Sequence, residues 1–354
     1  MTALRFLLDS DEFDVVGVKC HSPAKVGVDV GTIADRPSVG LAATSDPKLV
    51  EDLQPDCVVF MPRDDFVDPT SVEPAPEWFE DVLRILASGA NVVSPLQSPM
   101  HWRQLRDGAV LRERLQRACE IGGTTAFFTG VLPGFFNDYL PIALSSGARE
   151  IRQVRMLEAI DFGPLDAPET YSAMGFGAPS TGGSASIRSL YRSSWGCSIW
   201  LVADALGVEL DEIQVTDRTF AAESEYVSPG GFVVGEGMVG AIDVTMSGIV
   251  AGSPLIVTRH IARMGADIAP EWPRVGDLGG YRIEVDGAPP LVGEFPLGNP
   301  GGTGTCVGDS IVITAARCVN AIYATVAAPA GYRLLNETPR IGGGVLHSPG
   351  LQHG

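Results

Sequence analysis

Short apolar segments alternate with helical segments over the first 130 residues, and this alternation restricts the possible folds more than any other feature. Each apolar segment is too short for a helix and favours a strand, and helical periodicity follows it. Strands that are apolar on both faces are typical of parallel sheets, because the intervening helices cover both faces. The N-terminal part therefore predicts a doubly wound α/β sheet.

The expected strands are DVVGVKC (14–20), PDCVVFMP (55–62), NVVSP (91–95) and TTAFFTGV (124–131), with GLAATSD (40–46) as a further strand-like piece. The expected helices are residues 1–10, 47–54, 77–89 and 106–123, the last two ending at glycine. Such sheets bind ligands at the carboxyl ends of their strands, in the layout of a Rossmann-like dinucleotide-binding domain.

Residues 131–306 change in character, because β-branched or alternating runs such as 151–162, 231–250, 254–264 and 280–287 dominate there. These runs predict a mostly antiparallel sheet, and a helix is expected over 195–208. The predicted organisation is a dinucleotide-binding domain over 1–130, an α+β substrate and dimerisation domain over 131–306, a helix over 307–328 that returns to the first domain, and a flexible tail over 329–354.

The opening stretch MTALRFLLDS reads as the helix that should follow the glycine-rich phosphate turn, and neither that turn nor the first strand has a candidate in the sequence. The G-x-G-x-x-G run at Gly235–Gly240 precedes a β-branched segment rather than a helix, so we assign it to a hairpin. We therefore expect about 10–20 further residues before Met1, with the first strand and the turn. The alternative is a non-catalytic nucleotide-binding or structural homologue.

Charge and composition limit the class of protein. The net charge of −18 argues against nucleic acid or an anionic membrane as a partner. Six cysteines without a CxxC pair and five dispersed histidines predict neither a disulfide framework nor a metal site. Charged residues and glycines interrupt the apolar stretches of 230–258, and no signal peptide is recognisable, so we expect a cytoplasmic enzyme with no membrane span.

Several residues at expected strand ends are candidates for cofactor binding. After 14–20 there is no carboxylate to hold a ribose, whereas His21, Ser22 and Lys25 could hold a 2′-phosphate, which favours NADP over NAD and leaves dual use open. An exposed polar turn would look the same. Further candidates for the cofactor groove end other strands or follow them: Met61, Pro62, Ser94, Pro133, Gly134 and Asp138. Simple strand termination, or capping of the next helix by Asn137 or Asp138, explains them equally well.

Several motifs together resemble the 2,4-diaminopentanoate dehydrogenase family and related native NAD(P)-dependent amine dehydrogenases, whose first domain is similar to that of dihydrodipicolinate reductase. They are HSPAKVG (21–27), GANVVSP (89–95), TGVLPGFFNDYLPIALS (129–145), MGFG (174–177), LVADALGVELDEI (201–213), APEWP (269–273) and AARCVNAI (315–322). Dihydrodipicolinate reductase itself is a poorer match, because its His-His pair is lacking in EAIDF (158–162).

The resemblance implies that an amine, NAD(P)⁺ and water give a ketone, ammonia and NAD(P)H. A carboxylate would stabilise the developing iminium and accept protons. We expect Glu158 or Asp161 in this role, only one of them facing the substrate, since residues three apart on a strand point to opposite faces. Asn137 is a third catalytic candidate, and MGFG and Trp195 are candidates for an apolar substrate wall. An imine or ketone reductase is the alternative enzyme, and a homodimer that pairs through the antiparallel sheet is expected.

Overall fold

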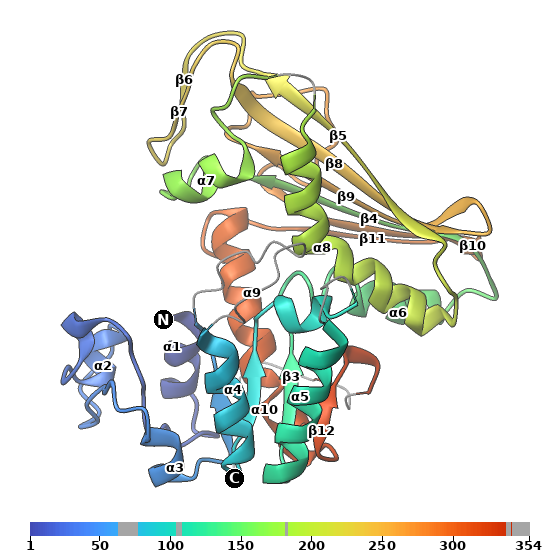
Figure 1. Cartoon of the computed structure of the whole chain (residues 1–354). Coiled ribbons are helices and arrows are strands. Elements are labelled where there is room, and N and C mark those ends of the chain that lie inside the picture. The colour runs from blue at the N-terminus through green and yellow to red at the C-terminus, as the bar shows by residue number, and fades with distance from the viewer. Residues whose placement is uncertain (63–76, 104–107, 181–182, 338–340, 342–354) are drawn as a thin grey trace, which may run out of the picture.

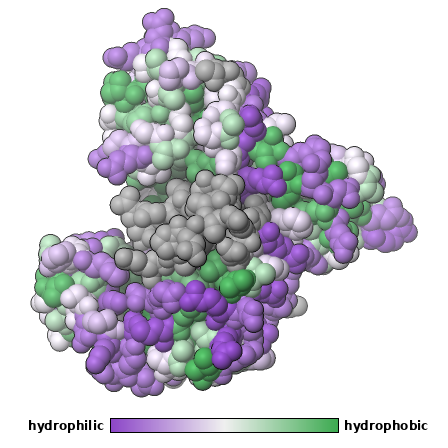
Figure 2. Space-filling model, viewed as in Figure 1, coloured by the Kyte–Doolittle hydropathy of each residue, from purple (hydrophilic) through white to green (hydrophobic). Residues whose placement is uncertain are grey.

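The computed structural model describes residues 1–62, 77–103, 108–180, 183–337 and 341. Within them the chain forms two main sheets, a parallel one in the lower part of Figure 1 and a larger, mixed one in the upper part. Helix α9 (Cys306–Asn320) stands between the two parts and contacts both α1 (Thr2–Leu8) and β4 (Glu150–Asp161). On the face shown in Figure 2, hydrophilic residues predominate and hydrophobic ones form smaller groups between them.

The parallel sheet has helices on both faces, as the sequence predicts. Its order is β1-β2-β3-β12, and the strands are β1 (Cys57–Val59), β2 (Asn91–Ser94), β3 (Thr125–Phe128) and β12 (Gly331–Arg333). Val92 packs with α4 (Glu77–Ala87) and α5 (Gly108–Gly122) on one face. The next residue, Val93, packs with the C-terminal helices on the other. This alternation is why each strand is apolar throughout.

The predicted strand over 14–20 does not form. Lys19 makes an isolated bridge with Thr44, and Val16 is 47% exposed. The segment GLAATSD likewise contributes only isolated bridges, including one from Ala42 to Asp29. A strand needs a hydrogen-bonded neighbour along its length, and the described part of the chain offers residues 14–20 only this one bridge. The apolar run of residues 14–20 is typical of a strand, but the run alone is not enough to form one without a paired neighbour.

The C-terminal segment differs from the prediction in two ways. The expected single helix over 307–328 is two helices, α9 and α10 (Ile322–Ala327), because the second packs on β1, β2 and β3 while the first packs on α1 and β4. The expected flexible tail is wrong for Gly331–Arg333, which pair in parallel with β3 as β12. Tyr332 is buried there against Phe128, and its hydroxyl donates to the Pro99 carbonyl at 2.9 Å.

Residues Cys306–Ala327 are long and apolar enough to cross a membrane by length and composition alone. That is weak evidence, because buried helices of globular folds have the same composition. In this fold Ala315, Cys318 and Ala321 are buried in apolar clusters with α1 and the parallel sheet.

The mixed sheet has the order β11-β10-β4-β9-β8-β5, and every neighbouring pair is antiparallel except β4 and β9. Besides β4 its strands are β5 (Glu212–Ala221), β8 (Val239–Val250), β9 (Ser253–Arg263), β10 (Gly279–Ala288) and β11 (Leu291–Pro296). Helix α8 (Ala185–Leu206) packs on one face. It begins ten residues before the predicted start, because Ile187 and Tyr191 give the serine-rich segment an apolar side that packs in the core of the mixed sheet.

The G-x-G-x-x-G run leads from one strand into another that belongs to a different sheet, so the expected hairpin does not form. Its first residues form a turn between β7 (Val233–Val234) and β8, in which the Met238 amide donates to the Gly235 carbonyl at 3.0 Å. A strand follows, so the run lacks the strand–turn–helix context of a phosphate-binding loop.

Replacing Tyr332 by Ala should lower the free energy of unfolding by about 3–5 kcal/mol, since a buried ring and its hydrogen bond are lost. The matched control is Tyr323→Ala, whose ring is 57% exposed and stacks on Phe13; it should cost less than about 1.5 kcal/mol. Urea unfolding followed by circular dichroism measures both. Equal losses would contradict the assignment of β12 to the sheet core.

Candidate active site

Three adjacent strands of the mixed sheet bring the central polar residues together. In the register of β10, β4 and β9, Glu158 lies directly opposite Tyr281 on one side and His260 on the other. Residues opposite each other in neighbouring strands point to the same face of a sheet, so the three side chains form a row.

Glu158 has three hydrogen-bonding contacts and is 3% exposed. The Tyr281 hydroxyl donates to Oε1 at 2.8 Å, and the Trp195 indole N–H donates to Oε2 at 3.1 Å. His260 Nδ1 also contacts Oε2. A carboxylate has about four lone-pair sites, so one site on Oε1 is left for a ligand.

The surroundings keep the neighbouring acids protonated. Burial, followed by the charge of Glu158, raises the pKa of Tyr281 well above its usual value, and the same two causes raise the pKa of Tyr191. Burial and then Glu158 raise the pKa of the Cys306 thiol to about 12. Tyr281 is therefore a hydrogen-bond donor at neutral pH, and Cys306 is not a thiolate nucleophile.

A cavity of about 340 Å³ lies over Glu158 at the junction of the two sheets. Alternate residues of β4, namely Glu158 and Ile160, form part of its wall, and Phe162 follows directly after the strand. The other described lining residues are Met1, Thr2, Ala3, Met61, Val131, Leu132, Trp195, Tyr281, Val307, Ser310, Ile311, Thr314 and Ala315. Glu158 is the one charged side chain among them, so a carboxylate faces a largely apolar space.

Asp161 points away from this cavity, in agreement with the expectation that only one of the two carboxylates faces it. Its Oδ1 accepts a hydrogen bond from the Gly163 amide at 2.9 Å. Burial raises the pKa of Asp161, although the Gly163 amide and two nearby arginines oppose that shift.

Asp138 caps helix α6 (Tyr139–Ser145) and is not among the residues that line the cavity over Glu158. Its carboxylate accepts hydrogen bonds from the amides of Tyr139 at 2.6 Å and Gly134 at 2.7 Å, and its side chain is fully buried. The capping alternative is correct, because both oxygens already have partners. Asn137 is also buried, and among the described residues its Oδ1 has no partner. It is not among the residues that line the cavity, and its catalytic role stays a prediction.

The remaining predicted cofactor residues lie around the carboxyl ends of the parallel strands. Met61 lines the cavity, with Pro62 next to it, and Ser94 is buried at the end of β2. Pro133 is buried, and Gly134 has φ +123°, where an added Cβ would lie 2.2 Å from the Gly130 nitrogen. These two shape the loop beside the lining residue Leu132.

His21, Ser22 and Lys25 are exposed at the short 3-10 helix Pro23–Lys25. Burial, then the charge of Lys25, lowers the pKa of the Met1 amino group, and Met1 lines the cavity. Of the predicted apolar wall, Trp195 lines the cavity, but Met174 and Phe176 are in the core beneath the mixed sheet.

Comparison with known proteins identifies the relatives of the chain. Residues 135–343 match the model of the 2,4-diaminopentanoate dehydrogenase C-terminal domain. The chain belongs to this family. It is 32% identical over 317 residues to an amine dehydrogenase of Streptomyces virginiae, covering 86% of each chain. The structure of the amine dehydrogenase from Mycobacterium smegmatis has the same fold, with a TM-score of 0.71, 20% identity and coverage of 96% of this chain and 93% of that one.

Family membership makes this protein an oxidoreductase of the amine dehydrogenase type with a Rossmann-like domain. Glu158, Trp195, His260 and Tyr281 all lie within the matched residues. Sequence reasoning missed His260 and Tyr281 as site residues. Both lie in runs that were correctly predicted as strands, but the order and register that put them beside Glu158 involve segments more than 100 residues apart.

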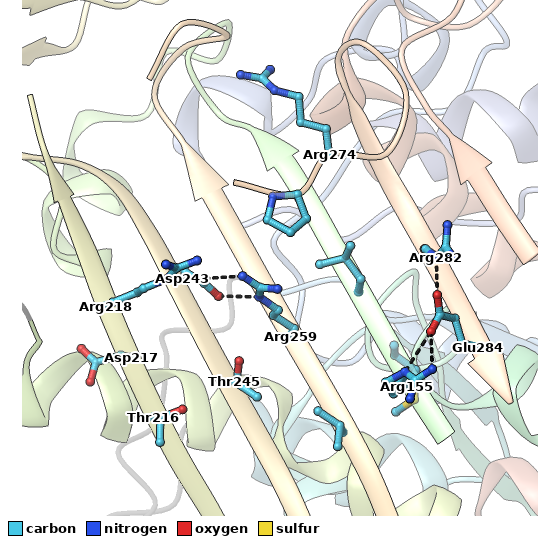
Figure 3. A pocket seen from close by; sticks show the side chains of 14 residues that line it. Arg155, Thr216, Asp217, Arg218, Asp243, Thr245, Arg259, Arg274, Arg282 and Glu284 are labelled. Atoms are coloured by element: carbon cyan, nitrogen blue, oxygen red, sulfur yellow. Dashed lines mark hydrogen bonds and ion pairs between the residues drawn. The ribbon is translucent and has the colours of Figure 1, made fainter. Parts of the chain in front are cut away.

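A second cavity, of about 670 Å³, lies on the other part of the mixed sheet. Figure 3 shows Asp243 held by Arg218 and Arg259, with ion-pair distances of 2.8 and 2.7 Å. Nearby, Glu284 is paired with Arg155 and Arg282. Five arginines and three carboxylates line this cavity, so positive charge is in excess there, and the cavity lies away from the parallel strands. We therefore take the smaller cavity as the candidate active site; pairing of this sheet in a homodimer stays a prediction.

Within the described part of the chain, no group of three or more His, Cys, Asp or Glu side chains is placed to hold a metal ion. All six cysteines are free thiols.

Asp161→Asn should increase stability at pH 7. The folded state raises the pKa of this carboxyl through burial, so its ionised form is disfavoured and its contribution to stability falls as pH rises through the folded pKa. Asn keeps an acceptor for the Gly163 amide and carries no charge. The increase in melting temperature should shrink as pH falls towards about 4, near the unfolded pKa. A gain that is independent of pH would contradict this account.

Proposed function

We propose that this protein is an NAD(P)-dependent amine dehydrogenase that interconverts a primary amine and a ketone plus ammonia. In the oxidative direction R₂CH–NH₂, NAD(P)⁺ and H₂O give R₂C=O, NH₃, NAD(P)H and H⁺. The observation that carries the proposal is the Glu158 carboxylate, which keeps one acceptor site towards an apolar cavity at the carboxyl ends of the parallel strands.

The residues around the cavity fit a nicotinamide cofactor. Ligands of doubly wound sheets bind beyond the carboxyl ends of the strands, where Met61 is found. Val131, Leu132 and Ile311 offer apolar contact to a flat ring, and Ser22 and Lys25 offer donors to a 2′-phosphate, which favours NADP. When bound, the nicotinamide ring supplies the acceptor for the hydride.

Glu158 would attract the substrate ammonium and stabilise the cationic iminium that develops. Charge stabilisation is strong in a cavity with apolar walls, because little water is present to screen it. The carboxylate is already held by donors from three elements, so it need not reorganise as the positive charge forms. Its remaining acceptor site on Oε1 can also take a proton from the water that attacks the iminium carbon.

The cavity also favours one class of amine. Among its described lining residues there is no lysine, arginine or histidine, so a substrate carboxylate would find no cationic side chain in the cavity wall. The remaining wall is apolar apart from a few hydroxyl groups and the indole N–H. We therefore propose amines whose nitrogen carries the single charge and whose substituents are alkyl groups.

Glu158→Gln should reduce kcat/KM for an amine by about 10²–10³-fold, since the charge that stabilises the iminium is lost. Asp161→Asn is the matched control, because it makes the same chemical change three residues along β4 but away from the cavity; its activity should stay near that of the wild type. NADPH and NADH formation at 340 nm measures both, and the melting temperature checks folding. Equal losses in the two variants would contradict the role of Glu158.

Pentan-2-amine and 4-aminopentanoate test the substrate class, because they share a carbon skeleton and differ by a carboxylate. Pentan-2-amine should have the higher kcat/KM, by at least about tenfold, because the acid must leave water and finds no cationic side chain in the cavity wall. In the reverse direction, reduction of pentan-2-one should require ammonium. Turnover without ammonium would instead support a ketone reductase.

A further inference from the structure

In the part of the chain that the structure describes, His260 has a single polar partner, Glu158. It is 2% exposed, and its Nδ1 contacts Oε2 of Glu158. The other ring nitrogen, Nε2, is buried and has no hydrogen-bond partner among the described residues. Tyr191 and Trp195 pack against the ring, with centroids 5.0 and 4.8 Å away.

These contacts select one protonation state of the ring. An imidazolium would leave a buried N–H at Nε2 without an acceptor, which is costly. A neutral ring with its proton on Nε2 has the same unpaired donor. In addition, its Nδ1 lone pair faces the lone pairs of Oε2 of Glu158, and the two repel each other. In the neutral ring with its proton on Nδ1, the Nδ1–H group donates to Glu158 and Nε2 carries only a lone pair. An unpaired acceptor of this kind costs less than an unpaired N–H, so this form is favoured.

We propose that His260 is the positioning residue of Glu158: as the neutral Nδ1–H tautomer it donates to Oε2 and holds the free acceptor site of Oε1 towards the cavity. This extends the proposed function, since the orientation of the carboxylate matters for an amine and for the iminium formed from it. Tyr281 and Trp195 hold the same carboxylate from β10 and α8, so His260 supplies the third point of attachment, from β9.

The tautomer can be tested without any catalytic activity. The chain has five histidines, and a long-range ¹H–¹⁵N spectrum of the uniformly ¹⁵N-labelled protein at pH 7 separates imidazolium from the two neutral tautomers. The signal lost in His260→Asn assigns His260. We expect the Nδ1–H pattern, with its shift changed in Glu158→Gln. An Nε2–H or imidazolium pattern would overturn the proposal.

Kinetics test the positioning role with two side chains of similar shape. Asn and Leu both branch at Cγ, but only Asn can place an N–H donor where Nδ1 lies. His260→Asn should keep a kcat about ten- to hundredfold above that of His260→Leu, which is the worth of one hydrogen bond to a charged group. The loss should appear in kcat more than in KM, because carboxylate placement counts most as the iminium charge develops.

Equal kcat values in folded Asn and Leu variants would overturn the positioning role. If His260→Leu does not fold, His260→Gln replaces it, since the Gln amide lies at the place of Nε2 rather than Nδ1. Absence of amine turnover in the wild type would contradict the proposed function. The NMR spectrum does not depend on turnover, so it would still show whether His260 donates from Nδ1 to Glu158. The two failures are therefore distinguishable.

Discussion

Burial of one carboxylate, Glu158, is the constraint on which the candidate site depends. An ion that leaves water must find hydrogen-bond donors, and here they come from β9, β10 and α8. Three elements that are distant in the sequence have to be in register before the charge is satisfied. The six-stranded sheet therefore assembles the site, because the pairing of β4 with β9 and β10 brings His260 and Tyr281 beside Glu158.

The position of the site follows from the way the two sheets are joined. Strand β4 supplies Glu158 from the mixed sheet, and α9 supplies the facing wall through residues such as Ile311 and Thr314. Since α9 also packs on α1 and is followed by α10 on the parallel sheet, it fixes the apolar half of the cavity relative to the carboxylate. The carboxylate and the apolar wall that faces it thus come from different parts of the fold.

Local sequence patterns predicted which segments form helices and strands better than they predicted which strands pair with one another. Runs such as 91–95 and 280–287 were recognised as strands because apolar periodicity is a local property. Residues 14–20 have the same pattern but make only one bridge, since strand formation also needs a neighbour. Glu158 was predicted from its place on β4 and from the family resemblance. Its partners His260 and Tyr281 could not be, because a single sequence does not contain the register between distant strands.

The composition of the cluster around Glu158 argues for function rather than stability. Well-packed apolar side chains often replace buried ionic groups at no cost in stability, so such groups are weak evidence for a structural role. Phe162, Tyr191 and Trp195 already provide close aromatic packing around His260. A carboxylate that faces an apolar cavity and still has a free acceptor site adds little to that packing. It is, however, the group that a reaction through a cationic intermediate requires, because it places a negative charge where the positive one forms.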